Sequence, residues 1–130
     1  MEADVRHSLA LAFALALTAC AQTSAHRIDV TPRQATCAAA IHTYLKPDSV
    51  GAPYQELAYL SVSGGALASD EKLLRSLRNK AADVGGNGLI YQFLDFSPGF
   101  LESPNGQAIA IYIPSDTARI ATECRRKVPA

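Results

Sequence analysis

Residues 70–96 read DEKLLRSLRNKAADVGGNGLIYQFLDF and hold the clearest structural signal in the chain. Ser69 is a good N-cap, and two acidic residues follow it in the first turn, where the helix dipole favours negative charge. Five apolar residues recur at helical spacing and form one stripe: Leu73, Leu74, Leu77, Ala81 and Val84. Gly85 and Gly86 end this pattern, because glycine permits the left-handed backbone that closes a helix. The pattern predicts a helix over 70–84 and a strand over 89–96.

Three more strands are predicted around this helix. Residues 54–62 (YQELAYLSV) are apolar on both faces, as expected for a central strand, while 38–45 and 107–113 show strand-like alternation. The helix joins the strands at 54–62 and 89–96 into a βαβ unit, whose crossover should be right-handed. We therefore expect residues 37–130 to form a single α+β domain. Its small mixed sheet would have about four strands in the order β-β-α-β-β, with one main helix packed on it.

The first residues have the features of a lipoprotein signal peptide. Residues 9–19 (LALAFALALTA) form an apolar run that is too short to cross a membrane but has the length of a signal-peptide core. Residues 17–20 (LTAC) then supply a branched residue, two small residues and the thiol that accepts the lipid. We expect residues 1–19 to be removed and Cys20 to be acylated. The alternative is an ordinary secretory signal that is cut beside an incidental Cys20.

Acylation would decide where the protein works. Each buried CH₂ group contributes about 0.8 kcal/mol to membrane attachment, so several acyl chains on Cys20 would anchor the chain firmly. Ala21 stands where an aspartate would favour retention in the inner membrane, so we expect an outer-membrane lipoprotein that faces the periplasm. Residues 20–36 are polar and aperiodic, and they predict a tether between the lipid and the folded domain.

Cys37 and Cys124 lie near the two ends of the predicted domain. Export places them in an oxidising compartment, so we expect a disulfide between them. Closing a loop of about 88 residues would stabilise the domain by roughly 4–5 kcal/mol. Metal ligation and redox chemistry are the alternatives. The chain has no CxxC motif, and a zinc site needs at least three convergent ligands, so no metal and no cofactor are expected.

Several polar residues invite a catalytic interpretation, and each has a simpler one. Residues 61–65 (SVSGG) lack the GxSxG arrangement of a nucleophile turn, and residues 86–88 (GNG) precede a strand instead of opening a helix. Glu56 and Asp95 could approach each other across the sheet as an acid–base pair, although isolated carboxylates are far more common. His42 is expected to be a packed or surface residue. We therefore expect that the protein is not an enzyme.

Residues 77–90 (LRNKAADVGGNGLI) carry a family resemblance. They resemble the helix-to-strand signature of small bacterial envelope lipoproteins, including RcsF-like stress sensors, YbjQ-like proteins and several uncharacterised families. Residues 54–58 (YQELA) are similar to a strand of the uncharacterised members. The resemblance spans residues 37–113 and implies an α+β fold with one main helix on a small sheet. It transfers no function, because the extra cysteines and the long tether of RcsF-like sensors and the metal ligands implied for some YbjQ-like proteins are missing here.

Composition and patterning complete the expectation. Twelve Lys and Arg residues balance twelve Asp and Glu residues, which excludes nucleic-acid binding through bulk charge. Two strands are apolar on both faces although one helix is available, so the tail, the loop 97–106, a second copy or a partner must cover the second face. We expect a membrane-anchored, non-catalytic envelope protein with a structural, sensing or protein-interaction role. The alternative is a periplasmic module that binds a small ligand or a metal.

Overall fold

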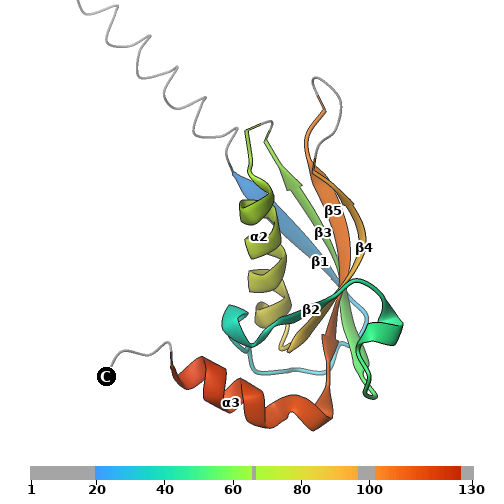
Figure 1. The fold of residues 1–130 in the computed structure, drawn as a ribbon, viewed down its shortest axis with the longest axis vertical. Helices are drawn as coiled ribbons and strands as arrows, with labels where there is room; N and C mark the ends of the chain where they lie inside the picture. The colour runs from blue at the N-terminus through green and yellow to red at the C-terminus, as the bar shows by residue number, and fades with distance from the viewer. Residues whose placement is uncertain (1–19, 66, 97–101, 127–130) are drawn as a thin grey trace, which may run out of the picture.

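The computed structural model describes residues 20–65, 67–96 and 102–126. They form a five-stranded sheet with one long helix packed along a single face and a second helix at one end (Figure 1). The strands are β1 (Ala21–Arg27), β2 (His42–Tyr44), β3 (Gln55–Gly64), β4 (Gly88–Asp95) and β5 (Asn105–Tyr112). The helices are α2 (Asp70–Asp83) and α3 (Thr117–Arg125), with the short 3₁₀ turns η1 (Ala38–Ala40), η2 (Pro47–Ser49) and η3 (Pro114–Asp116).

The strand order is β1-β3-β5-β4-β2, so the predicted βαβ unit is split. β5 lies between β3 and β4 and runs antiparallel to both, while β2 runs parallel to β4 at the edge. The predicted α+β fold with a mixed sheet is confirmed. The sheet has five described strands instead of the expected four, because the segment before the domain contributes one.

The main helix forms as predicted. The Ser69 side chain accepts a hydrogen bond from the backbone N–H of Lys72, which caps the first turn of α2. Leu73, Leu77 and other residues of the predicted stripe are buried against the sheet. Gly85 follows the helix with φ of +88°, and a Cβ there would lie 2.7 Å from Cβ of Arg33. Both the backbone angle and the close approach therefore require glycine at this position.

The predicted tether over 20–36 is wrong for its first part. Residues 21–27 form β1, which pairs antiparallel with β3 from Ala21 opposite Gly64 to Arg27 opposite Ala58. Every second residue in the first part of this strand is small and partly buried on the side of α2. There the Thr23 hydroxyl lies 2.6 Å from the Ser76 hydroxyl. Residues after β1 remain attached as well, since the N–H of Ile28 donates to the carbonyl of Leu57. A polar sequence forms a strand here because an existing sheet edge supplies its hydrogen bonds.

The strand predicted over 38–45 is much shorter than expected. Residues 38–40 form the 3₁₀ turn η1, and only 42–44 pair with β4. Lys46 and Pro47 follow directly and lead into η2, so the chain leaves the sheet after three paired residues. After β5 the chain forms η3 and continues directly into α3.

Two apolar clusters hold the layers together, one on each face of the sheet. The larger cluster packs α2 on β3, β4 and β5. The smaller one contains Ile90, Ile109, Ile111 and Ile113 on the opposite face. Four side chains from the end of β2 and the segment between β2 and β3 pack against it: Tyr44, Val50, Ala52 and Tyr54. This segment was not among the covers expected from the sequence, and the expected loop 97–106 lies partly outside the described residues.

The predicted disulfide between Cys37 and Cys124 is present, with a Cα–Cα distance of 5.6 Å. It joins the chain just before η1 to the last turn of α3. It lies at the opposite end of the sheet from the start of β1 (Figure 1). The cross-link therefore holds the C-terminal helix against the lower end of the domain.

Candidate functional site

Beside the smaller cluster on the second sheet face, described residues line a shallow groove with a volume of about 650 Å³. We call this surface the open sheet face. Its lining side chains come from four neighbouring strands: Ser24, His26, Tyr59, Ser61, Gln92 and Gln107. The alternation of side chains along β3 produces this surface, because Leu60 and Val62 point to α2 while Tyr59 and Ser61 point away from it.

The open sheet face combines neutral polar groups with aromatic rings. Tyr59 is 47% exposed, and Phe93, opposite Gln107 in the β4–β5 register, is 49% exposed. Ile109, 7% exposed, lies on the same face beside Tyr59. No Lys, Arg, Asp or Glu is among the described residues that line the groove. Such a surface can donate and accept hydrogen bonds and can stack against a partner.

The sequence-predicted acid–base pair is not brought together. Glu56 lies opposite Ile111 and Asp95 lies opposite Asn105, so the two carboxylates sit near opposite ends of β5. Six residues of strand separate these positions, which corresponds to about 20 Å. The suggestion that Glu56 and Asp95 could act together is therefore wrong, because β5 runs between β3 and β4 and sets their registers apart.

The serine-containing segment 61–65 offers no nucleophile arrangement either. Ser61 lines the same groove as His26, but the described lining contains no carboxylate that could orient the imidazole. Ser63 lies further along β3, exposed on the same face. The residue pattern is explained by a strand that ends at Gly64 before α2.

Asn87 joins the start of β4 to the chain that follows β5. Its side chain is fully buried and bonds the backbone of Ile113 twice: Nδ2 donates to the carbonyl over 2.9 Å, and Oδ1 accepts from the N–H over 2.7 Å. These bonds continue the β4–β5 ladder beyond the last paired residue of β5. The two residues lie 26 positions apart in the sequence, so these are tertiary contacts.

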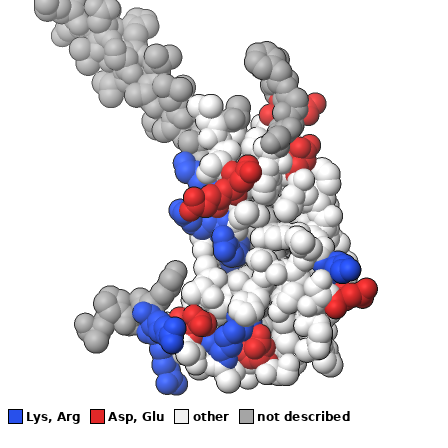
Figure 2. Space-filling model, viewed as in Figure 1, with Lys and Arg blue, Asp and Glu red and all other residues white. Residues whose placement is uncertain are grey.

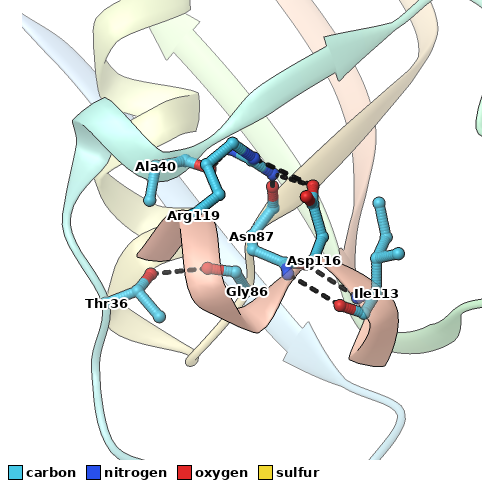
Figure 3. A network of polar contacts seen from close by, with 7 residues as sticks. All are labelled: Thr36, Ala40, Gly86, Asn87, Ile113, Asp116 and Arg119. Carbon is cyan, nitrogen blue, oxygen red and sulfur yellow. Dashed lines mark hydrogen bonds and ion pairs between the residues drawn. The ribbon is translucent and has the colours of Figure 1, made fainter. Parts of the chain in front are cut away.

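Arg119 of α3 completes this polar network, which Figure 3 shows. Its guanidinium donates to the backbone carbonyls of Ala40 and Asn87 and pairs with the carboxylate of Asp116 at 2.5 Å. Hydrogen bonds from Arg119 hold the pKa of Asp116 below its usual value. The network joins α3, η1 and the start of β4, and sequence reasoning missed it because no local pattern marks Arg119.

His42 lies beside this network, on the edge strand β2. Its backbone N–H donates to the carbonyl of Asn87, and the residue is exposed. Its proximity also lowers the pKa of Asp116 slightly. The surface position agrees with one of the two alternatives predicted for His42.

Neither cysteine of the disulfide is available as a metal ligand. Within residues 20–65, 67–96 and 102–126, no three His, Cys, Asp or Glu side chains come together to hold an ion. None of the helices in these ranges is long and apolar enough to span a bilayer.

Cys20 is exposed at the start of β1. Its backbone carbonyl accepts a hydrogen bond from the N–H of Gly65 over 3.1 Å. A second groove of about 420 Å³ begins at Cys20 and runs between β1 and α2, past Lys72 and Arg75. Basic and acidic side chains are interspersed over α2 and around α3 on the face in Figure 2.

Comparison with known proteins adds one result, which concerns the fold. The sequence matches no protein-family model and no curated protein. A similar solved structure is the Francisella virulence factor FvfA in an orthorhombic crystal form, with a TM-score of 0.55 and 13% sequence identity. The alignment covers 69% of this chain and 96% of the FvfA chain. At this identity the likeness shows that the two chains share a fold.

Proposed function

We propose that the chain is a membrane-anchored bacterial lipoprotein that acts in the envelope through protein contacts and without catalysis. Cys20 carries the lipid in this proposal, and the open sheet face binds another envelope protein. The observation that carries the contact role is a groove whose described lining holds an exposed tyrosine and no Lys, Arg, Asp or Glu, on a sheet that has an apolar cluster on each face. The lipoprotein signature at residues 17–20 carries the anchoring role.

The fold supports processing at this signature. β1 begins at Ala21, so cleavage before Cys20 would leave every described strand and helix intact. Cys20 is exposed, which leaves its sulfur accessible to an acyl-transfer enzyme. The disulfide suits an oxidising compartment such as the periplasm. We place the protein at the outer membrane, facing the periplasm, and its resemblance to RcsF-like and YbjQ-like lipoproteins stays a prediction from the sequence.

The composition of the open sheet face supports a protein partner. Centres of protein interfaces are enriched in aromatic residues and depleted in charged ones. Tyr59 and Phe93 are each about half exposed, and the surrounding side chains are amides, hydroxyls and the imidazole of His26. A buried catalytic centre would instead bring titratable groups together, and the carboxylates singled out above are about 20 Å apart.

Cell fractionation tests the anchor. With an ordinary secretory signal in place of residues 1–19, so that cleavage does not depend on acylation, Cys20→Ser should move the protein from the membrane fraction to the soluble fraction, because the sulfur that carries the diacylglycerol is gone. Gln22→Ser is the matched control, since it places a serine at an exposed position two residues further along but leaves the attachment residue in place. Retention of the Cys20→Ser protein in the membrane fraction would contradict the proposed anchor.

Site-specific photo-crosslinking in cells tests the contact surface. A benzoylphenylalanine at position 59 should form one discrete heteromeric adduct. The same probe at Leu45, which is 81% exposed outside the groove, should not form it. Phe93→Ser should weaken the adduct formed from position 59. An adduct of twice the chain's mass would indicate self-association, and equal adducts from both positions would count against a dedicated face.

A small ligand is the second candidate occupant, because a groove of about 650 Å³ falls within the size range of ligand sites. Thermal-shift measurements with small-molecule and metal panels separate the two functions. A saturable increase in melting temperature that Tyr59→Ser abolishes would favour the ligand. No such increase is expected if the partner is a protein.

A further inference from the structure

We infer that the domain rests directly on the bilayer, with the turn between β3 and α2 at the depth of the lipid headgroups. This inference rests on the proposed acylation of Cys20 and adds an orientation and a contact surface to it. The surface, which we call the anchored end, consists of Cys20, residues 65 and 67–69 of the turn, and the first turns of α2. Its partner is the lipid surface itself.

The first argument is the length of chain between the lipid and the sheet. β1 begins at Ala21, and Ala21 already pairs with Gly64 of β3. The carbonyl of Cys20 accepts a hydrogen bond from Gly65, so the residue that would carry the acyl chains is itself held against the domain. No flexible segment separates the two, and the domain cannot move away from the headgroups without breaking these contacts.

The second argument is that several connections meet at this end. The N–H of Gly64 bonds the carbonyl of Pro104, which places the start of β5 beside the end of β3. Figure 1 shows β1 starting, β3 ending and α2 starting at one end of the sheet, with α3 at the other. Lys72 and Arg75 line the groove that begins at Cys20, while Arg75 pairs with Glu71 at 2.6 Å, so this end carries charges of both signs.

The third argument is an exposed leucine at the expected depth. Leu67 is 64% exposed, although it belongs to the turn that is bonded to Cys20. It follows Gly65 by two residues, so its Cα is within about 8 Å of the Cα of that glycine. The polar headgroup region is roughly 5–8 Å thick on each side of the membrane, so a side chain this close to the anchor can reach the acyl boundary. An apolar side chain is favoured there.

Depth-dependent fluorescence on the lipidated protein tests this inference. An environment-sensitive fluorophore is attached to Leu67→Cys in the full chain, which is expressed in a bacterium that processes lipoproteins and reconstituted in vesicles. Acylation blocks the sulfur of Cys20, and the other two cysteines form the disulfide, so the introduced thiol is labelled selectively. Val30→Cys is the matched control, because Val30 is 81% exposed and follows β1 at the far end.

The expected result is blue-shifted emission at position 67 that nitroxide-labelled lipids quench, with neither effect at position 30. Inserting ten Gly and Ser residues between Cys20 and Ala21 should abolish both effects at position 67, because such a linker spans roughly 17–19 Å. Equal, water-like emission at both positions in the acylated protein would overturn the inference and leave the anchor standing. Quenching at both positions would also overturn it, since the domain would then lie on its side. A chain that incorporates no labelled palmitate would refute the proposed function itself.

Discussion

Replacing Asn87 by alanine should remove a large part of the stability of the domain. The change deletes both side-chain hydrogen bonds to the backbone of Ile113. Ile113 is only 2% exposed, so its backbone N–H and carbonyl would stay buried without these partners. Each unsatisfied buried group costs about 1–3 kcal/mol, so we expect a loss of about 2–6 kcal/mol. A small domain has a total stability of about 5–15 kcal/mol, which makes this a severe effect for a single side chain.

Urea unfolding followed by circular dichroism, with the disulfide intact, measures this loss. With a slope of about 1–3 kcal/mol per molar urea, a loss of 3 kcal/mol lowers the midpoint by roughly 1–3 M. Asn79→Ala is the matched control, because Asn79 is exposed on α2 and alanine is the better helix former. It should leave the midpoint unchanged or raise it slightly.

Asn87→Asp separates hydrogen bonding from side-chain volume. The aspartate is nearly isosteric and can still accept from the N–H of Ile113, but its ionised form cannot donate to the carbonyl. We expect a destabilised protein whose deficit shrinks as the pH falls and the carboxyl group is protonated. A free energy of unfolding for Asn87→Ala within about 0.5 kcal/mol of that of the parent protein would refute this reasoning, because a difference of that size is an ordinary surface effect.

Three further stability measurements test other parts of the fold. Gly85→Ala should lower the free energy of unfolding more than Gly51→Ala does. Both glycines have a positive φ, which costs an alanine about 1–2 kcal/mol, but of these two sites only Gly85 has another residue within reach of the added Cβ. Thermal unfolding should reveal a loss of roughly 4–5 kcal/mol in Cys37→Ser, and reduction of the parent protein should reproduce it. Because Arg119 lowers the pKa of Asp116, the stability from this pair is present at neutral pH and disappears as the pH falls below about 4. In Arg119→Gln the free energy of unfolding should fall less steeply below about pH 4, and the same pH dependence as in the parent protein would contradict the role of the pair.

Local sequence signals were sufficient to predict the main helix. Its cap at Ser69, its apolar stripe and its terminal glycine all lie within 17 residues, and the structure reproduces each of them. The cysteine pair was predictable too, because two cysteines remained after the proposed anchor. These features depend on neighbouring residues or on residue counts, which one sequence contains.

Features that depend on distant pairing were not predictable. β1 is polar and becomes a strand because β3, more than thirty residues away, supplies its hydrogen bonds. The position of β5 between β3 and β4 likewise follows from sheet assembly, and it is what separates Glu56 from Asp95. The open sheet face follows from the same assembly, since it lies beside the cluster against which the chain between β2 and β3 packs.

The intact mass of the protein extracted from bacterial membranes tests the central claim most directly. Our account predicts a chain that begins at Cys20, carries a diacylglyceryl group on its sulfur with a further acyl group on its amine, and retains the disulfide. An unacylated chain that still begins at Met1, or one cut elsewhere with an unmodified Cys20, would contradict it.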